Sequence, residues 1–234
     1  MKISQEIAEL AGAFAADGSM QKEHLCMWGN IHQDAEYYDI VLSRLFLEAF
    51  DIRIRPHPKP SNSVYGFYVC KKEVIKFFNE VLGFPIGSKT YTVEVPKIIM
   101  DDPSLYAAFI RGFTDNDGCL YFSKRKGKYC KFKLENNTYP RIDITSVSHK
   151  IIDEIKYMLD HLEIKGTVVM KKNGKKQKVQ SKAVYIRGEE NLRRWMKIIG
   201  FNNSVYFTKI QVWQKFGFCP THKTLEERKA MLAQ

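Results

Sequence analysis

The hydrophobic and polar positions of the first hundred residues predict the order helix, strand, strand, helix, strand, strand, helix. In 20–32, apolar Leu25 and Met27 alternate with polar positions, which is typical of a half-buried strand. Ser4 is a good N-cap for the first helix, and Gly18 is a good stop. The predicted elements are a helix at 4–17, a strand or hairpin at 20–32, a helix at 34–50 begun by Asp34, strands at 52–56 and 63–70, and a helix at 71–82.

The same order of elements recurs in the second part of the chain. YVCKKEVIKFFNEVLGF at 68–84 matches YIRGEENLRRWMKIIGF at 185–201. The copies are offset by 100 residues at the end of the first helix and by 117 at the last, so the second is 17 residues longer. Two unequal copies of one αββαββα unit predict a pseudo-symmetric α+β fold in a monomer. The second set comprises a helix at 103–117, strands at 119–124 and 140–146, a helix at 148–162, strands on either side of 171–182 and a helix at 189–199.

The two parts of the chain differ sharply in charge. Residues 1–100 hold 11 Lys and Arg against 12 Asp and Glu, a net charge of −1, whereas residues 101–234 hold 26 against 14, a net charge of +12. The runs 124–133 and 171–182 carry six basic residues each and no acidic one. One such run fits a solvated hairpin. Two runs, each beside a strand pattern, favour a polyanionic partner, most simply nucleic acid.

Composition excludes several other classes of protein. The longest apolar runs are far shorter than the roughly 20 residues of a membrane span, so no membrane association is expected. Five scattered cysteines without a C-x-x-C pair argue against a disulfide framework or a zinc site. Glu6 and Glu9 interrupt any signal-peptide pattern. We therefore expect a protein that is not secreted, in a cytoplasmic (nucleoid-associated) or organellar compartment.

The strongest local signal is a pair of helix ends, LAGAFAADG at 10–18 and IRGFTDNDG at 110–118. Each is an apolar helix with glycine at the third position of the motif. A glycine inside a helix costs about 1 kcal/mol relative to alanine, so Gly12 and Gly112 need a compensating reason. Close approach of two helix backbones is the usual one, which predicts that these two helices form an interface.

Each of these helices ends in Asp-Gly, with Asp17 in one and Asp117 in the other. A carboxylate in the last helical turn faces the negative end of the helix dipole. If the helices pack in parallel, the two carboxylates repel each other, by roughly 4 kcal/mol at 4 Å and an effective dielectric of 20. A divalent metal ion would reverse the sign of that interaction, because hard cations such as magnesium bind carboxylate oxygens.

The motifs, their spacing and the repeat order resemble the LAGLIDADG homing endonucleases in their single-chain, two-motif form. The resemblance covers about the first 215 residues. Ala15 stands where the motif has its first acid, which Asp115 retains, and Arg111 replaces a small residue. The eighth position of the motif, where the family keeps its metal-binding acids, is aspartate in both copies.

This resemblance implies a rigid monomer whose two antiparallel sheets form a saddle over the major groove of double-stranded DNA. The motif helices would form the central interface. Asp17 and Asp117, followed by Gly18 and Gly118, would hold Mg²⁺ or another divalent cation such as Mn²⁺ at the two scissile phosphates. The expected division is an N-terminal half at 1–100, a C-terminal half at 101–215 and a tail at 216–234 with a short helix.

Family members often add one catalytic lysine per half after the last helix of the repeat. Lys89 fits this position six residues after Gly83, whereas Lys209 lies nine residues after Gly200. A phosphate-steering or solvated role is an equal alternative for each lysine. Gln33 and Ser146 are further candidates near the site. The polar strand faces should contact DNA; the candidates are Lys22, His24, Trp28, Asn30, His32, Gln33, Arg53 and Arg55 in the first half, and Lys124, Arg125, Lys126, Lys128, Arg141, Asp143, Lys178, Gln180 and Lys182 in the second.

These features favour an intron-encoded or free-standing, site-specific homing endonuclease that makes metal-dependent double-strand breaks in a long, asymmetric DNA target. Two alternatives share the fold. One is an RNA maturase that binds its own intron RNA and assists splicing. The other is a non-catalytic DNA-binding protein. Retention of both Asp17 and Asp117 favours cleavage, because a non-catalytic descendant is expected to lose at least one of these acids.

Overall fold

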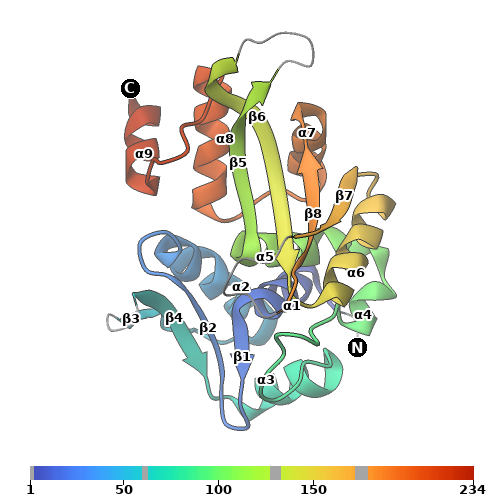
Figure 1. Cartoon of the computed structure of the whole chain (residues 1–234). Helices are drawn as coiled ribbons and strands as arrows, with labels where there is room; N and C mark the ends of the chain where they lie inside the picture. The colour runs from blue at the N-terminus through green and yellow to red at the C-terminus, as the bar shows by residue number, and fades with distance from the viewer. Residues whose placement is uncertain (1–2, 60–62, 127–132, 172–178) are drawn as a thin grey trace.

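The computed structural model describes residues 3–59, 63–126, 133–171 and 179–234, and it contains two four-stranded antiparallel sheets. In Figure 1 the sheet of the first half lies below and that of the second half above, with α1 and α5 between them. Both sheets have the same topology, in which the third strand in sequence lies at an edge. The first sheet, in the order β1-β2-β4-β3, contains β1 (Gly18–Met20), β2 (Leu25–Asn30), β3 (His57–Lys59) and β4 (Val64–Val69).

The second sheet repeats this arrangement with longer strands. Its first hairpin is the main enlargement, since β5 and β6 together span most of the extra residues of the second half. The α+β fold class with two pseudo-symmetric units is therefore confirmed. The second sheet, in the order β5-β6-β8-β7, contains β5 (Gly118–Lys126), β6 (Lys133–Ser146), β7 (Gly166–Met170) and β8 (Lys182–Arg187).

Helices pack on one face of each sheet and at the junction of the halves (Figure 1). Ser4 caps α1 as predicted, because its Oγ accepts a hydrogen bond from the Ile7 amide. Two helices continue through a π-helical turn, η1 into α2 and α3 into η3. The helical elements are α1 (Gln5–Asp17), η1 (Tyr37–Leu42), α2 (Ser43–Phe50), α3 (Lys72–Lys76), η3 (Phe77–Val81), α4 (Lys97–Met100), η4 (Pro103–Leu105), α5 (Tyr106–Asp117), α6 (His149–His161), α7 (Glu189–Ile198), α8 (Ser204–Phe216) and α9 (Leu225–Ala233).

The hydrophobic core runs through both halves without interruption. Leu25, Met27 and Phe67 form the inner face of the first sheet, and all three are fully buried. Leu120 and Ile144 do the same in the second sheet. The alternation read from the sequence thus sets which face of each sheet meets the helices and leaves the opposite face to solvent. No helix among the described residues is long and apolar enough to cross a membrane.

The predicted strand at 52–56 is wrong. This segment is extended, but it forms no part of a sheet, and Ile54 alone among its residues is buried in the core. The strand lies one step later, at β3, where His57 pairs with Gly66 of β4. Pro58 lacks an amide hydrogen, but an edge strand tolerates it because one side of the strand makes no ladder hydrogen bonds.

The sequence pattern also missed α8, which follows directly after the repeat. Asn203 caps this helix by accepting a hydrogen bond from the Val205 amide. The last helix, α9, is the short helix predicted for the tail; it begins at a capping box formed by Thr224 and Glu227 and packs against α8. These two helices distinguish the second half from the first.

Candidate functional site

The site is built on the contact between α1 and α5, the two motif helices. A Cβ atom added to Gly12 would lie 2.1 Å from the Phe109 carbonyl oxygen, and one added to Gly112 would lie 2.0 Å from the Glu9 carbonyl oxygen. No side chain fits at either position, so the two backbones touch directly. This contact fixes the ends of the two helices relative to each other.

Asp17 and Asp117 are the last residues of these helices, and the structure brings their carboxylates together. Burial first, and then the neighbouring charges of Asp117 and Asp34, raise the pKa of Asp17 to about 7, against the opposing effect of Lys89. Asp117 is reached by solvent, yet the protein atoms crowded around it also raise its pKa, against the opposing effect of Lys89. The pair therefore carries an electrostatic cost that a bound cation would relieve.

Gly18 and Gly118 each lead from the aspartate straight into a strand. A Cβ at Gly18 would overlap the Phe14 ring at 2.0 Å, and one at Gly118 would lie 2.3 Å from the Thr114 methyl carbon. Both glycines are thus required by the tight exit from the helix. The sharp turn holds each carboxylate at the C-terminal end of its helix.

Lys89 is a cation whose charge acts on both aspartates and lowers the pKa of each. Its Nζ donates hydrogen bonds to the Ala15 and Ala16 carbonyl oxygens at 2.7 and 3.1 Å. Burial lowers the pKa of this ammonium, while Asp117 and Asp17 act to raise it. With Ser146 and Asp117, Lys89 lines a cavity of about 260 Å³ between the two halves.

Lys209 has different surroundings from Lys89. Its Nζ donates to the Leu120 carbonyl oxygen at 2.9 Å and lies 5.3 Å from the Tyr206 ring centre. Burial lowers the pKa of Lys209. Cys119 acts to raise it, and Arg228 lowers it further. The nine-residue gap after Gly200 places this lysine one helical turn further along α8.

Two other residues take the place of a second lysine. The Asn203 side-chain amide donates to the Asp115 carbonyl oxygen at 3.0 Å, and Asp115 is the counterpart of Ala15 at the offset of 100 residues. Tyr206 stands six residues after Gly200, the spacing of Lys89, and its hydroxyl donates to the Gly118 carbonyl oxygen. The two halves therefore present different groups to the helix ends, one cationic and one neutral.

Asp34 is a functional candidate that the sequence pattern indicated only as the start of a helix, and a helix does begin directly after it, with the Asp34 carbonyl oxygen accepting from the Tyr38 amide. Its Oδ2 accepts from the Asn30 amide at 2.8 Å, and its Oδ1 accepts from the Asn203 Nδ2 at 3.1 Å. It is also one of the charges that raise the Asp17 pKa. Gln33, the predicted neighbour of the site, is exposed, and its amide donates to the Asn30 carbonyl oxygen and side chain. The sequence feature that could have identified Asp34 as a site residue is its carboxylate just after the first predicted hairpin.

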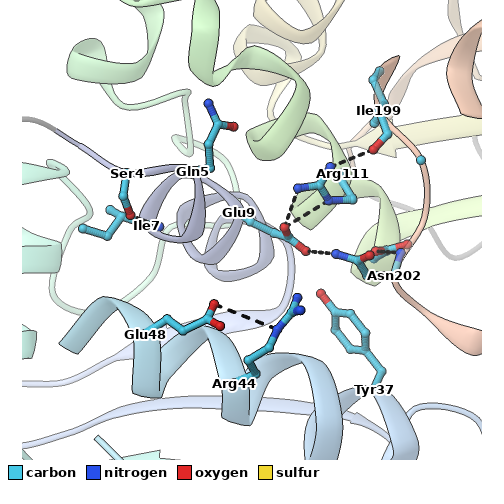
Figure 2. Close-up of polar contacts among 12 residues, drawn as sticks. Ser4, Gln5, Ile7, Glu9, Tyr37, Arg44, Glu48, Arg111, Ile199 and Asn202 are labelled. Carbon is cyan, nitrogen blue, oxygen red and sulfur yellow. Dashed lines mark hydrogen bonds and ion pairs between the residues drawn. The ribbon is translucent and has the colours of Figure 1, made fainter. Parts of the chain in front are cut away.

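A buried polar cluster braces the same helix pair (Figure 2). The Arg111 guanidinium donates two hydrogen bonds to Glu9 Oε2, at 3.0 and 2.7 Å, and one to the Ile199 carbonyl oxygen. Glu9 Oε1 accepts from Asn202 Nδ2 at 2.6 Å, and the Asn202 amide donates to Asp115. Arg111, the motif's departure from a small residue, thus ties α1 and α5 to the loop that carries Asn203.

Asp115 itself is fully enclosed. One of its carboxylate oxygens, Oδ1, has no hydrogen-bond partner. Burial raises its pKa well above the ordinary value, and the Glu9 carboxylate adds to the effect more than Arg111 offsets it. A protonated, neutral Asp115 is the form that this environment favours.

The outer faces of the two sheets differ in chemistry. On the second sheet, Arg141 Nε donates to Ser123 Oγ at 3.0 Å, and Tyr121 donates to Asp143 at 3.2 Å. Lys182, predicted to contact DNA, instead pairs with Asp153 of α6. Lys124 and Gln180 are exposed, Arg125 and Lys126 lie on β5, and Lys128 and Lys178 lie outside the described residues.

On the first sheet, the predicted contact residues are mostly accessible. Trp28 and His24 are half-buried among other rings. The Asn30 side chain accepts hydrogen bonds from the His32 and Gln33 amides, so the turn after β2 holds it in place. The remaining predicted residues that are exposed here are Lys22, Arg53 and Arg55.

The site offers two carboxylates to a metal ion. Within the part of the chain that the structure describes, no group of three or more His, Cys, Asp and Glu side chains is placed to hold a metal. Asp17 and Asp117 nonetheless fit a divalent cation chemically, because both are oxygen donors and because burial raises the pKa of both, which a bound cation would counteract. Further coordination would have to come from backbone carbonyl, water or substrate oxygens.

Known proteins share the fold that carries this geometry. The family model described as a LAGLIDADG-like domain matches residues 104–200. No curated protein matches the sequence. Mesophilic variants of the homing endonuclease I-DmoI match with a TM-score of 0.56 and 13% sequence identity over 85% of this chain and 91% of theirs. I-DmoI in complex with DNA and Mn matches with a TM-score of 0.54 and 12% identity over 84% of this chain and 96% of that one. A variant of I-SmaMI gives a TM-score of 0.55 and 12% identity over 92% and 90%.

Proposed function

We propose that the chain is a LAGLIDADG protein, a family whose domain model matches residues 104–200, and that it is a site-specific DNA endonuclease that cuts both strands of its target. The observation that carries the proposal is the pair Asp17 and Asp117. Two neighbouring carboxylates at the ends of two closely packed helices, with the pKa of both raised, destabilise the metal-free protein. An arrangement with this cost has a chemical use in a nuclease, where metal-bound carboxylates face a phosphate.

The cleavage would depend on a divalent cation, magnesium or manganese, held by Asp17 and Asp117. The ion would polarise the attacking water and stabilise charge on the phosphate. I-DmoI, which shares the fold, has been solved with DNA and Mn. This chain's own contribution is to hold the carboxylates in place through the Gly12 and Gly112 contact, and to place the Lys89 ammonium within reach of the same charges.

The target would be long and asymmetric. The two sheets extend from either side of the helix pair, so a continuous duplex crossing both would contact many base pairs (Figure 1). Their outer faces differ in charge, and the groups at the helix ends differ between Lys89 and Asn203. A palindromic target would not match such unequal halves. A single chain already supplies both halves, which fits action as a monomer. The scattered cysteines fit a reducing, cytoplasmic or organellar compartment.

A cleavage assay tests the proposal directly. The full-length protein is incubated with a plasmid library of random inserts in magnesium buffer, in manganese buffer and in EDTA, and the ends of linear products are sequenced. We expect one recurrent target, cut on both strands only with the divalent ion. Recurrent binding without any cut would favour the non-catalytic DNA-binding alternative. Tighter binding to a structured intron RNA than to any duplex would favour the maturase.

A further inference from the structure

The outer face of the first sheet carries a cluster of aromatic rings, here called the ring cluster and made of His24, Trp28, His57 and Tyr68. Trp28 lies at the centre, 5.2 Å from the Tyr68 ring and 5.4 Å from the His57 ring, both edge to face. His24 packs on Tyr68 in the same way at 5.3 Å. These four residues come from three strands and the turn before β2.

Strand register puts the ring cluster on the face that points away from the core. Trp28 pairs with Gly66, and Gly66 pairs with His57, so the three positions share one face across the sheet. The alternate residues Met27 and Phe67 are fully buried on the other face. Tyr68 is 44% exposed. The core does not need these rings, and they remain open to a partner.

Gly66 sets the position of the central ring. A Cβ at Gly66 would lie 2.0 Å from the Met27 carbonyl oxygen and 2.9 Å from the Trp28 Cε3 atom, so the β2 backbone and the indole together occupy the space of a side chain. The edge-to-face packing then holds the indole between Tyr68 and His57. A fixed aromatic surface loses little side-chain entropy when it binds, which makes it suited to recognition rather than to simple coverage of a sheet.

The corresponding face of the second sheet has another character. Arg141 pairs with Tyr121 on one side and with Arg187 on the other, so two guanidinium groups lie side by side across adjacent strands. The Arg187 guanidinium lies 5.0 Å from the Tyr185 ring centre. Arginine recognises guanine through the O6 and N7 acceptors of the major groove. Charged donors thus dominate one sheet and apolar ring surface the other.

We propose that the ring cluster reads the C5-methyl groups of thymine in the half-site beneath the first sheet. In the major groove, thymine is the base that presents an apolar group, and aromatic carbon contacts it favourably. Lys59, whose Nζ lies 5.6 Å from the Trp28 ring centre, gives the cluster a cationic edge towards the phosphates. The occupant is therefore duplex DNA with a thymine-containing half-site. This inference rests on the proposed function and names what that same surface recognises.

The test removes the methyl groups from the DNA and leaves the protein intact. Binding duplexes are first selected with the full-length protein in EDTA from a random-sequence library. Each selected duplex is then rebuilt with uracil for thymine in one half-site at a time, and the dissociation constants are compared. We expect thymine enrichment in one half-site and about fourfold weaker binding for each contacted methyl lost there. Uracil in the other half-site should change affinity by less than about twofold.

Two variants assign the effect to the ring cluster. In Trp28→Ala the ratio of the uracil to the thymine dissociation constant should fall to about one, and Tyr68→Ala should reduce it. Tyr185→Ala, which removes a ring from the outer face of the second sheet, should leave the ratio unchanged. Equal affinity for thymine and uracil in the wild type, or an unchanged ratio in Trp28→Ala, would overturn the inference while leaving DNA recognition in place. Failure to select any duplex would instead overturn the proposed function and this inference with it.

Discussion

Replacing Asp17 with asparagine should stabilise the metal-free protein near neutral pH even though it removes a proposed metal ligand. In the folded chain the pKa of Asp17 is raised from 3.8 to about 7, by burial first and then by the charges of Asp117 and Asp34. Asparagine keeps the size and shape of the side chain and removes the charge. We thus expect Asp17, as a residue needed for activity, to lower the free energy of unfolding of the metal-free protein.

The sign and size follow from proton linkage. Because the pKa of Asp17 is raised on folding, its protonated form contributes stability that is fully present below about pH 4 and is lost as the pH rises through about 7. At about 1.4 kcal/mol for each unit, the shift of roughly three units corresponds to about 4 kcal/mol, of which about half is lost by pH 5.5. The advantage of Asp17→Asn over the wild type should therefore be about 2 kcal/mol larger at pH 8 than at pH 5.5.

Urea unfolding in EDTA at pH 5.5 and pH 8 measures this difference. In thermal unfolding it should appear as a gap in Tm that widens by about 4–8 °C at the higher pH. Asp51→Asn is the matched control, because Asp51 is exposed and its left-handed conformation, with φ of 54°, suits asparagine. Its effect should be the same at both pH values. A gap for Asp17→Asn that does not widen with pH would refute the electrostatic account of the site.

Three further substitutions test other parts of the architecture. Gly112→Ala should lower the free energy of unfolding by at least about 3 kcal/mol in urea titrations, because its Cβ would meet the Glu9 carbonyl oxygen at 2.0 Å. Arg111→Met leaves the buried Glu9 carboxylate without its partly exposed cation and should cost about 3 kcal/mol in the same assay, with partial recovery on adding Glu9→Gln. Lys89→Met should slow cleavage of one strand at least about tenfold, seen as accumulated nicked plasmid, because the other half presents the neutral Asn203 instead.

Local sequence signals were sufficient for the helix ends and the strand faces. Ser4 and the Thr224–Glu227 capping box mark helix starts with side-chain hydrogen bonds to nearby amides, and the structure contains both. The alternation around Leu25 predicts which face of β2 is buried. These features depend on residues within one or two turns of each other, which is why the sequence pattern captures them.

Long-range contacts account for what the sequence did not show. Asn203 takes the place of a second lysine because α8 brings its amide against Asp115, 88 residues away in sequence. Aspartate is a common N-cap residue, but the Asp34 carboxylate accepts hydrogen bonds from the Asn30 amide and the Asn203 side chain instead. The 52–56 segment alternates as a strand would, yet no neighbouring strand pairs with it, because β4 pairs with β3. Pairing partners cannot be read from alternation alone.

The central claim is that Asp17 and Asp117 act in cleavage and not in DNA recognition. The most direct measurement compares binding and cleavage of one selected target by the wild type, Asp17→Asn and Asp117→Asn, in magnesium buffer under identical conditions. We predict that each variant binds the target within a few-fold of the wild type and produces no double-strand break. Cleavage at the wild-type rate by either variant would contradict the account.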